Sequence, residues 1–136
     1  MRAAITLALA LLVVAPGTAA WQPTGTGTGK AKAKSMPTTA PAAPTATVSS
    51  HDVTVTWTAS TFLEGGAVPS YKVRRYDALS TLQTIGAACS GTVTGTSCIE
   101  HVVPAGTWFY TVTPLVGIWQ NAGTESPKGS AVIVLP

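Results

Sequence analysis

The chain has 136 residues and a formal net charge of +3, and only 10% of its residues are charged. A chain of this length has room for one domain with a single hydrophobic core. The positive charge does not belong to that domain, because from residue 45 onward four lysines and arginines face five aspartates and glutamates. A domain close to neutrality lacks the basic surface with which proteins hold DNA or RNA. We therefore expect no nucleic-acid partner.

The first twenty residues have the layout of a secretory signal peptide. Arg2 supplies a positive start, residues 3–15 are apolar, and Pro16 and Gly17 precede small residues at 18–20. The apolar run is shorter than the ~20 residues needed to span a bilayer. We expect export and cleavage at this site, which gives a secreted protein. The alternative is an uncleaved leader that anchors the protein to the membrane.

Residues 21–44 are rich in Gly, Thr, Lys, Ala and Pro, a composition typical of an extended and solvated linker. Between Thr24 and Lys34, small residues alternate with Thr or Lys, which is the period of a strand but offers nothing large to bury. We expect the folded domain to occupy residues 45–136. The linker then sets its distance from the membrane or wall.

From residue 45 onward the sequence predicts β-structure throughout, because short alternating runs of Val, Thr, Ile, Tyr and Trp are separated by turn residues. No stretch has the sustained apolar period of a helix. We expect strands at residues 45–50, 52–58, 71–76, 81–88, 97–103, 107–113 and 130–135. Alternation assigns these side chains to the core: Trp57, Tyr71, Val73, Trp108, Tyr110 and Val112.

Four segments, in the right order, resemble fibronectin type III domains. They are PTATVSSHDVTVTWTAS with its strand ending at Trp57, YKVRRYD from Tyr71, VVPAGTWFYTVTP around Tyr110, and GTESPKGSAVIV before the end. The resemblance covers about residues 41–136. It implies an all-β fold, a seven-stranded Greek-key β-sandwich of the immunoglobulin-like kind. It also implies that Tyr110 is a corner tyrosine whose hydroxyl bonds to nearby backbone.

Cys89 and Cys98 lie nine positions apart, and an even pair of cysteines in an exported chain predicts one disulfide. Closing so short a loop stabilises a fold by roughly 2–3 kcal/mol in the chain-entropy treatment. The fibronectin type III family usually lacks cysteine, so this pair is a departure from it. A metal site would need more Cys or His nearby, and the chain has only two histidines. We expect no metal and no cofactor.

The sequence contains no recognisable catalytic motif. His51 and His101 each stand next to an acid, Asp52 and Glu100, but neighbours in a strand point to opposite faces, so neither pair forms a ready dyad. Nucleophile-elbow, zinc-protease and phosphate-loop motifs are absent. We expect a protein without enzymatic activity.

Two long loops carry the candidate ligand-facing residues, Trp119 in one and Phe62 with Leu63 in the other. An aromatic side chain on such a loop can stack on a sugar or anchor a protein partner. The alternative is that Trp119 folds back and covers one end of the sandwich, and Phe62 and Leu63 have the same packing alternative. Arg74 and Arg75 point to opposite faces of one strand, and we expect both charges to reach water.

These features predict a non-catalytic interaction module at the cell envelope, with a protein or a glycan as its partner. One alternative is a structural subunit of a surface appendage or matrix, in which residues 24–34 add as a strand to a neighbouring subunit's sheet edge. Another is a carbohydrate-binding accessory domain. The fold does not decide among them, because a sandwich hosts many unrelated functions.

Overall fold

The structure is a computed structural model that describes residues 34–116 and 121–136. The predicted leader, residues 21–33 of the predicted linker, and Trp119 lie outside the described residues. No helix within the described ranges is long and apolar enough to cross a membrane.

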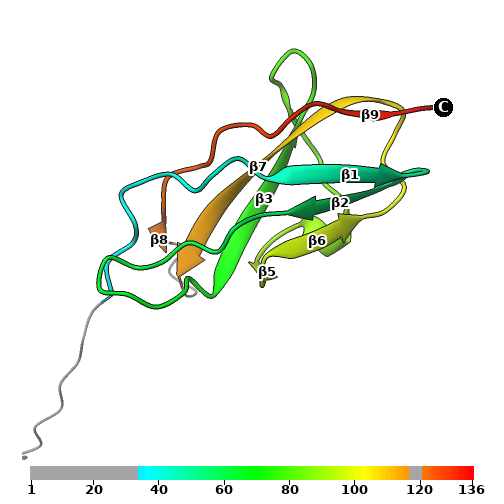
Figure 1. Cartoon of the computed structure of the whole chain (residues 1–136). Helices are drawn as coiled ribbons and strands as arrows, with labels where there is room; N and C mark the ends of the chain where they lie inside the picture. Colours follow the sequence, from blue (N-terminus) through cyan, green and yellow to red (C-terminus); the bar gives the residue numbers. More distant parts are fainter. Residues whose placement is uncertain (1–33, 117–120) are drawn as a thin grey trace, which may run out of the picture. The chain divides into compact units, whose positions relative to one another are not determined.

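Apart from one short 3-10 helix, the regular secondary structure of the described residues consists of strands, which confirms the all-β fold class (Figure 1). Its elements are β1 Thr45–Ser49, β2 Asp52–Thr56, β3 Ser70–Tyr76, β4 Leu82–Gln83, the 3-10 helix η1 Ala87–Cys89, β5 Val93–Thr94, β6 Ser97–Glu100, β7 Gly106–Val116, β8 Asn121–Ala122 and β9 Val132–Val134. All pairings are antiparallel. The first sheet has the order β1-β2-β6, and the second has the order β4-β3-β7-β8, with β5 also paired to β3 and β9 to β7.

One hydrophobic core lies between the two sheets, and alternation along the strands builds it. In β2, Val53 and Val55 are fully buried, whereas the threonine between them faces outward. Removing a valine-sized side chain from water contributes about 1.5–3 kcal/mol, so each such residue matters to a small domain. Of the side chains that alternation assigns to the core, Trp108 is half-buried against it, and the others are buried: Trp57, Tyr71, Val73, Tyr110 and Val112.

The strands differ from the predicted set in two regions. Residues 81–88 do not form one strand: they contain the short β4 and the start of η1, and the short β5 follows at Val93–Thr94. Within the predicted strand, Gly86 donates its N–H to the Glu100 carboxylate and Ala87 begins the 3-10 turn, so the chain leaves the extended conformation there. In contrast, β7 continues through Pro114 into the predicted loop and pairs with β8. The described residues thus contain nine strands rather than the expected seven.

The folded domain also begins before the predicted boundary at residue 45. Ser35 donates its N–H to the Glu64 carboxylate at 2.8 Å, and its carbonyl accepts the N–H of Leu63 at 3.2 Å. Pro44 is among the most completely buried residues of the chain. Composition indicates a linker here because Pro, Ala and Thr drive little burial by themselves. The segment nevertheless lies along a domain that the rest of the chain builds, so residues 34–44 belong to that domain.

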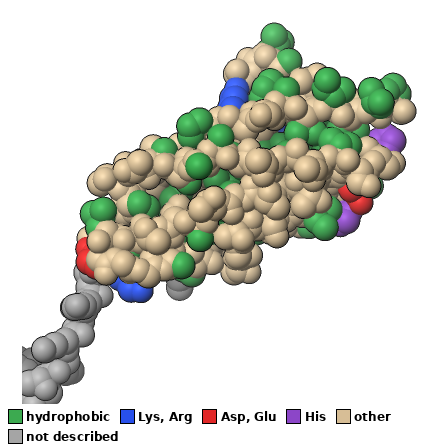
Figure 2. Space-filling model, in the orientation of Figure 1, with side chains coloured by type: hydrophobic (Ala, Val, Ile, Leu, Met, Phe, Trp, Pro, Cys, Tyr) green, Lys and Arg blue, Asp and Glu red, His purple; other side chains and the backbone are tan. Residues whose placement is uncertain are grey.

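Hydroxyl groups cover the outer face of the first sheet. Its strand register forms two rows across the three strands, Thr45–Thr56–Ser97 and Thr47–Thr54–Ile99. The hydroxyls of Thr45 and Thr56 lie 2.8 Å apart. Few charged side chains appear on the face of the molecule shown in Figure 2, and histidine side chains lie at one end of that view.

Candidate functional site

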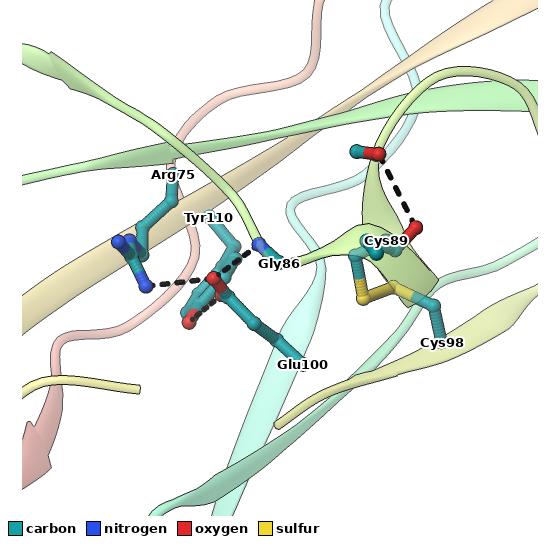
Figure 3. Close-up of a disulfide and its surroundings, with 8 residues drawn as sticks. Arg75, Gly86, Cys89, Cys98, Glu100 and Tyr110 are labelled. Carbon is teal, nitrogen blue, oxygen red and sulfur yellow. Dashed lines mark hydrogen bonds and ion pairs between the residues drawn. A yellow bond between two sulfur atoms is a disulfide. The ribbon is translucent and has the colours of Figure 1, made fainter. Parts of the chain in front are cut away.

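A polar cluster centred on the Glu100 carboxylate lies buried between the two sheets (Figure 3). Glu100 comes from β6 in the first sheet, and Arg75 and Tyr110 come from β3 and β7 in the second. Arg75 Nη1 donates to Glu100 Oε1 at 2.7 Å, the Tyr110 hydroxyl donates to Oε2 at 2.8 Å, and the Gly86 N–H donates to Oε1 at 2.7 Å. Both carboxylate oxygens are therefore used within the protein, and the cluster ties the sheets together.

Burial, and then the hydrogen bond to Glu100, raise the pKa of the Tyr110 hydroxyl well above its usual value. The hydroxyl therefore remains a protonated donor to the carboxylate. The side chains of Arg75 and Glu100 are only 7% and 2% exposed, so this ion pair is one of the least accessible polar features of the domain. A group so enclosed has a structural role, because a ligand cannot reach it.

Two expectations about this cluster are wrong. The charge of Arg75 does not reach water: its Nη2 donates to the Thr84 carbonyl at 2.6 Å, and its guanidinium lies 4.5 Å from the Trp108 ring centroid. Alternation along β3 points Arg75 inward, where a buried charge needs an opposite charge, and Glu100 supplies it. The Tyr110 hydroxyl bonds to Glu100 and not to backbone, because that carboxylate lies within its reach.

The structure contains the predicted disulfide between Cys89 and Cys98, with their Cα atoms 5.4 Å apart. Both cysteines are buried, and the bond joins η1 to β6 two residues before Glu100. The N–H of Gly86, at the start of η1, donates to Glu100. The disulfide therefore holds η1 where it completes the buried cluster, as Figure 3 shows.

Neither histidine forms an ion pair with the acid next to it in the sequence. His101 directly follows β6, and its Nδ1 lies 3.0 Å from Oδ2 of Asp52 at the start of β2; the two side chains are 61% and 45% exposed. The hydrogen bond from His101 lowers the pKa of Asp52. His51 has a contact of 3.4 Å with the Ser50 hydroxyl. Within the described ranges no group of three or more His, Cys, Asp or Glu side chains could hold a metal ion.

Phe62 and Leu63, two of the three loop residues expected to face a ligand, differ in their exposure to solvent. Phe62 is only 6% exposed and belongs to the core, with the Lys34 amine 4.9 Å from its ring centroid. Of the two alternatives for Phe62, the structure shows the packing one, because its ring belongs to the hydrophobic core. Leu63 is 63% exposed. Trp119, the third of these candidates, lies outside the described residues.

The outer face of the second sheet carries an apolar row that the sequence analysis missed. Tyr76 on β3 points outward and pairs with Phe109 on β7 and with Leu82 on β4. Ile133 on β9 pairs with Thr107, two residues before Phe109 and on the same face. Leu82 and Ile133 are 57% and 62% exposed, and the two aromatic rings are half-buried. We call Leu82, Tyr76, Phe109 and Ile133 the aromatic row.

Charged side chains lie next to the aromatic row. The Lys128 amine lies 4.8 Å from the Tyr76 ring centroid and 5.7 Å from that of Phe109. Glu125 is already paired with Arg74 at 2.5 Å and accepts a hydrogen bond from the Tyr76 hydroxyl at 2.9 Å. Among the ion pairs of the described residues, none involves Lys128. Its charge is therefore available to a partner.

Hydrogen bonds and the charge of Arg74 favour the ionised form of the Glu125 carboxyl. Burial alone would raise the pKa of Glu125, but hydrogen bonds from Thr111 and Tyr76, together with the charge of Arg74, lower it overall. Partial burial, and then the bond to Glu125, raise the pKa of the Tyr76 hydroxyl. Glu125 thus fixes Arg74 and Tyr76 at one edge of the aromatic row.

Comparison of the sequence with protein-family models found no match, and comparison with curated proteins found none. The geometry therefore has to indicate the function. Of the features described above, the Glu100 cluster is enclosed, the first sheet presents hydroxyls, and the second sheet presents exposed apolar groups beside a cation.

Proposed function

We propose that the chain is a non-catalytic interaction module that acts outside the cytoplasm and binds a protein partner through the aromatic row. The observation that carries the proposal is the exposure of Leu82 and Ile133 at either side of two half-buried aromatic rings. Aromatic and long apolar side chains at the centre of a surface are the usual anchors of protein interfaces. Lys128 adds charge to this patch and favours a partner that presents a carboxylate.

The strand arrangement supports a sandwich of the fibronectin type III kind. The order β1-β2-β6 faces a second sheet in which β4, β3, β7 and β9 are successive neighbours. After β2 the chain crosses to the second sheet, forms β3 and β4, and returns to the first sheet, where β6 pairs with β2. Such crossings between the two sheets are typical of Greek-key sandwiches. In this proposal β5 and β8 are short additions to a seven-stranded frame, and the Glu100 cluster replaces the usual partner of the corner tyrosine.

Two features support a location outside the cytoplasm. Residues 1–20 have the signal-peptide pattern, and the Cys89–Cys98 disulfide is of a kind that persists in oxidising compartments. The proposal is a secreted protein, with anchoring through an uncleaved leader as the alternative. N-terminal sequencing of the protein recovered from producing cells and from their medium distinguishes them: an N-terminus near residue 21 indicates secretion, and retained Met1 or Arg2 indicates an anchor.

Site-specific photo-crosslinking tests the binding surface. A photoreactive amino acid replaces Leu82 in the aromatic row, and in a control it replaces Ile99 on the outer face of the first sheet, where the exposed fraction is 43%. We expect one discrete crosslinked protein from producing cells with the reagent at Leu82 and none with it at Ile99. Crosslinking at Ile99 alone, or at neither position, would overturn the proposal.

A further inference from the structure

Two threonines in the segment that precedes β1 are presented to solvent. Thr38 and Thr39 are both exposed and lie at a bend between Pro37 and Pro41. Residues 35–50 contain no charged side chain, and the neighbours at 40, 42 and 43 are alanines. Proline-spaced threonines of this kind are typical of O-glycosylated segments in exported proteins, because the hydroxyls stay accessible on extended backbone.

Thr39 differs from Thr38 in lying beside a shallow hollow of the surface. The hollow has a volume of about 270 Å³ and lies between residues 37–42 and residues 58–61. Thr39 lies on the wall formed by residues 37–42, and the wall formed by residues 58–61 carries Thr58, Ser60 and Thr61. The other lining residues are alanines and prolines, so the hollow is uncharged, with apolar patches and hydroxyl groups.

The chemistry of this hollow suits a single sugar. Sugars present hydroxyls at their edges and apolar C–H faces, and this wall offers hydroxyl partners beside alanine and proline surface. A volume of about 270 Å³ is below the roughly 300–1,000 Å³ of pockets that enclose a drug-sized ligand, so it has room for one sugar unit and not for a long glycan.

We propose that Thr39 is an O-glycosylation site and that the first sugar lies in this hollow. The Thr39 Oγ1 would attack the anomeric carbon of a sugar activated as a phosphate ester, carried on a lipid or a nucleotide. A new C–O bond forms to Thr39, and the bond between the anomeric carbon and the phosphate oxygen breaks, with the electron pair leaving on the phosphate. The hydroxyl proton passes to a base of the glycosyltransferase. The inference rests on the export that forms part of the proposed function.

Intact-mass analysis of the full chain recovered from producing cells tests the site. We expect the mass to exceed that of the leader-cleaved sequence by that of at least one sugar unit, and peptide fragmentation to place the sugar on Thr39. The variant Thr39→Ala should lose it, and the control Thr38→Ala should retain it. An unmodified wild-type mass, or a sugar that remains in Thr39→Ala, would overturn the assignment.

The position of the sugar has its own test. Nuclear Overhauser effects between the sugar protons and the Ala59 methyl are expected if the sugar lies in the hollow, and their absence from a glycosylated sample would refute that part. Crosslinking at Leu82 with the Thr39→Ala protein separates this inference from the binding proposal. If the Thr39→Ala protein still crosslinks at Leu82, the aromatic row binds its partner independently of the sugar. If the wild-type protein crosslinks at Leu82 but carries no sugar, the glycosylation proposal is rejected and the binding proposal stands.

Discussion

Replacing Glu100 with glutamine tests whether the buried cluster holds the two sheets together. Glutamine has the same shape but no charge, so Arg75 would stay enclosed, with a side chain 7% exposed, and without its anion. Removal of one partner from a buried ion pair costs about 3–5 kcal/mol. One kcal/mol shifts the melting temperature of a domain of about 100 residues by roughly 4 °C. The melting temperature should therefore fall by at least about 12 °C.

A double variant separates the charge from the shape. Arg75→Met leaves the Glu100 charge buried with its bonds from Tyr110 and Gly86, and it should also be strongly destabilising. In Arg75→Met/Glu100→Gln no buried charge remains, and the glutamine carbonyl can still accept the Gly86 N–H. The double variant should therefore lose less free energy of unfolding than the two single variants together.

The assay is urea unfolding followed by circular dichroism, with the slope of each transition compared among the variants. The control is Glu125→Gln, which breaks the partly exposed ion pair with Arg74 and should cost about 0–1 kcal/mol. A cost below about 1 kcal/mol for Glu100→Gln, or strict additivity in the double variant, would refute the reasoning about the buried charge.

Three further predictions concern the disulfide and the titrating groups. Replacing Cys89 and Cys98 with serine should lower the free energy of unfolding by roughly 2–3 kcal/mol in urea melts; an unchanged midpoint would contradict this. The pKa of Glu125 is lowered from 4.5 in the fold, so its contribution to stability is present above that value and is lost as the pH falls through the lowered pKa. Glu125→Gln should flatten the acid side of the stability profile, and the same acid slope in both proteins would show that this carboxyl is not responsible. The pKa of Tyr110 is raised above 10.0, so its contribution is present below pH 10 and declines as the pH rises further. Tyr110→Phe should remove part of the alkaline loss seen in thermal melts, whereas an equal loss would exclude the hydroxyl as its source.

Much of the fold could be predicted, because apolar and polar residues alternate along the strands and show which side chains face the core. Val53 and Val55 alternate with threonines, and a strand with one apolar face follows directly. The cysteine spacing likewise indicated the disulfide. The start of the domain could not be predicted, because residues 34–44 fold only against surfaces formed by later segments such as Leu63 and Glu64.

The buried cluster was missed for a related reason. Alternation places Arg75 on one of the two faces of its strand but does not reveal that Glu100, 25 residues away, approaches from the other sheet. Without that partner an arginine is expected to reach water. The ion pair between the two sheets therefore determines the role of Arg75, and the local sequence around Arg75 does not indicate that pair.

The aromatic row could be predicted in part. Alternation alone points Tyr76 and Phe109 outward, since Arg75 and Tyr110 next to them face the core. Their alignment with Leu82 depends on the register of β4, which has only two residues, and that register is set by the turn that follows β3. The residues predicted to face a ligand lie instead on the two long loops.

Binding affinity tests the role of the aromatic row most directly. The partner crosslinked at Leu82 would be titrated calorimetrically with wild-type protein, with Leu82→Glu/Ile133→Glu, and with the matched control Ile99→Glu. These positions are 57%, 62% and 43% exposed, so stability should change little in any variant. We predict at least a roughly tenfold loss of affinity, about 1.4 kcal/mol, for the double variant and wild-type affinity for the control. Wild-type affinity in the double variant would contradict the account.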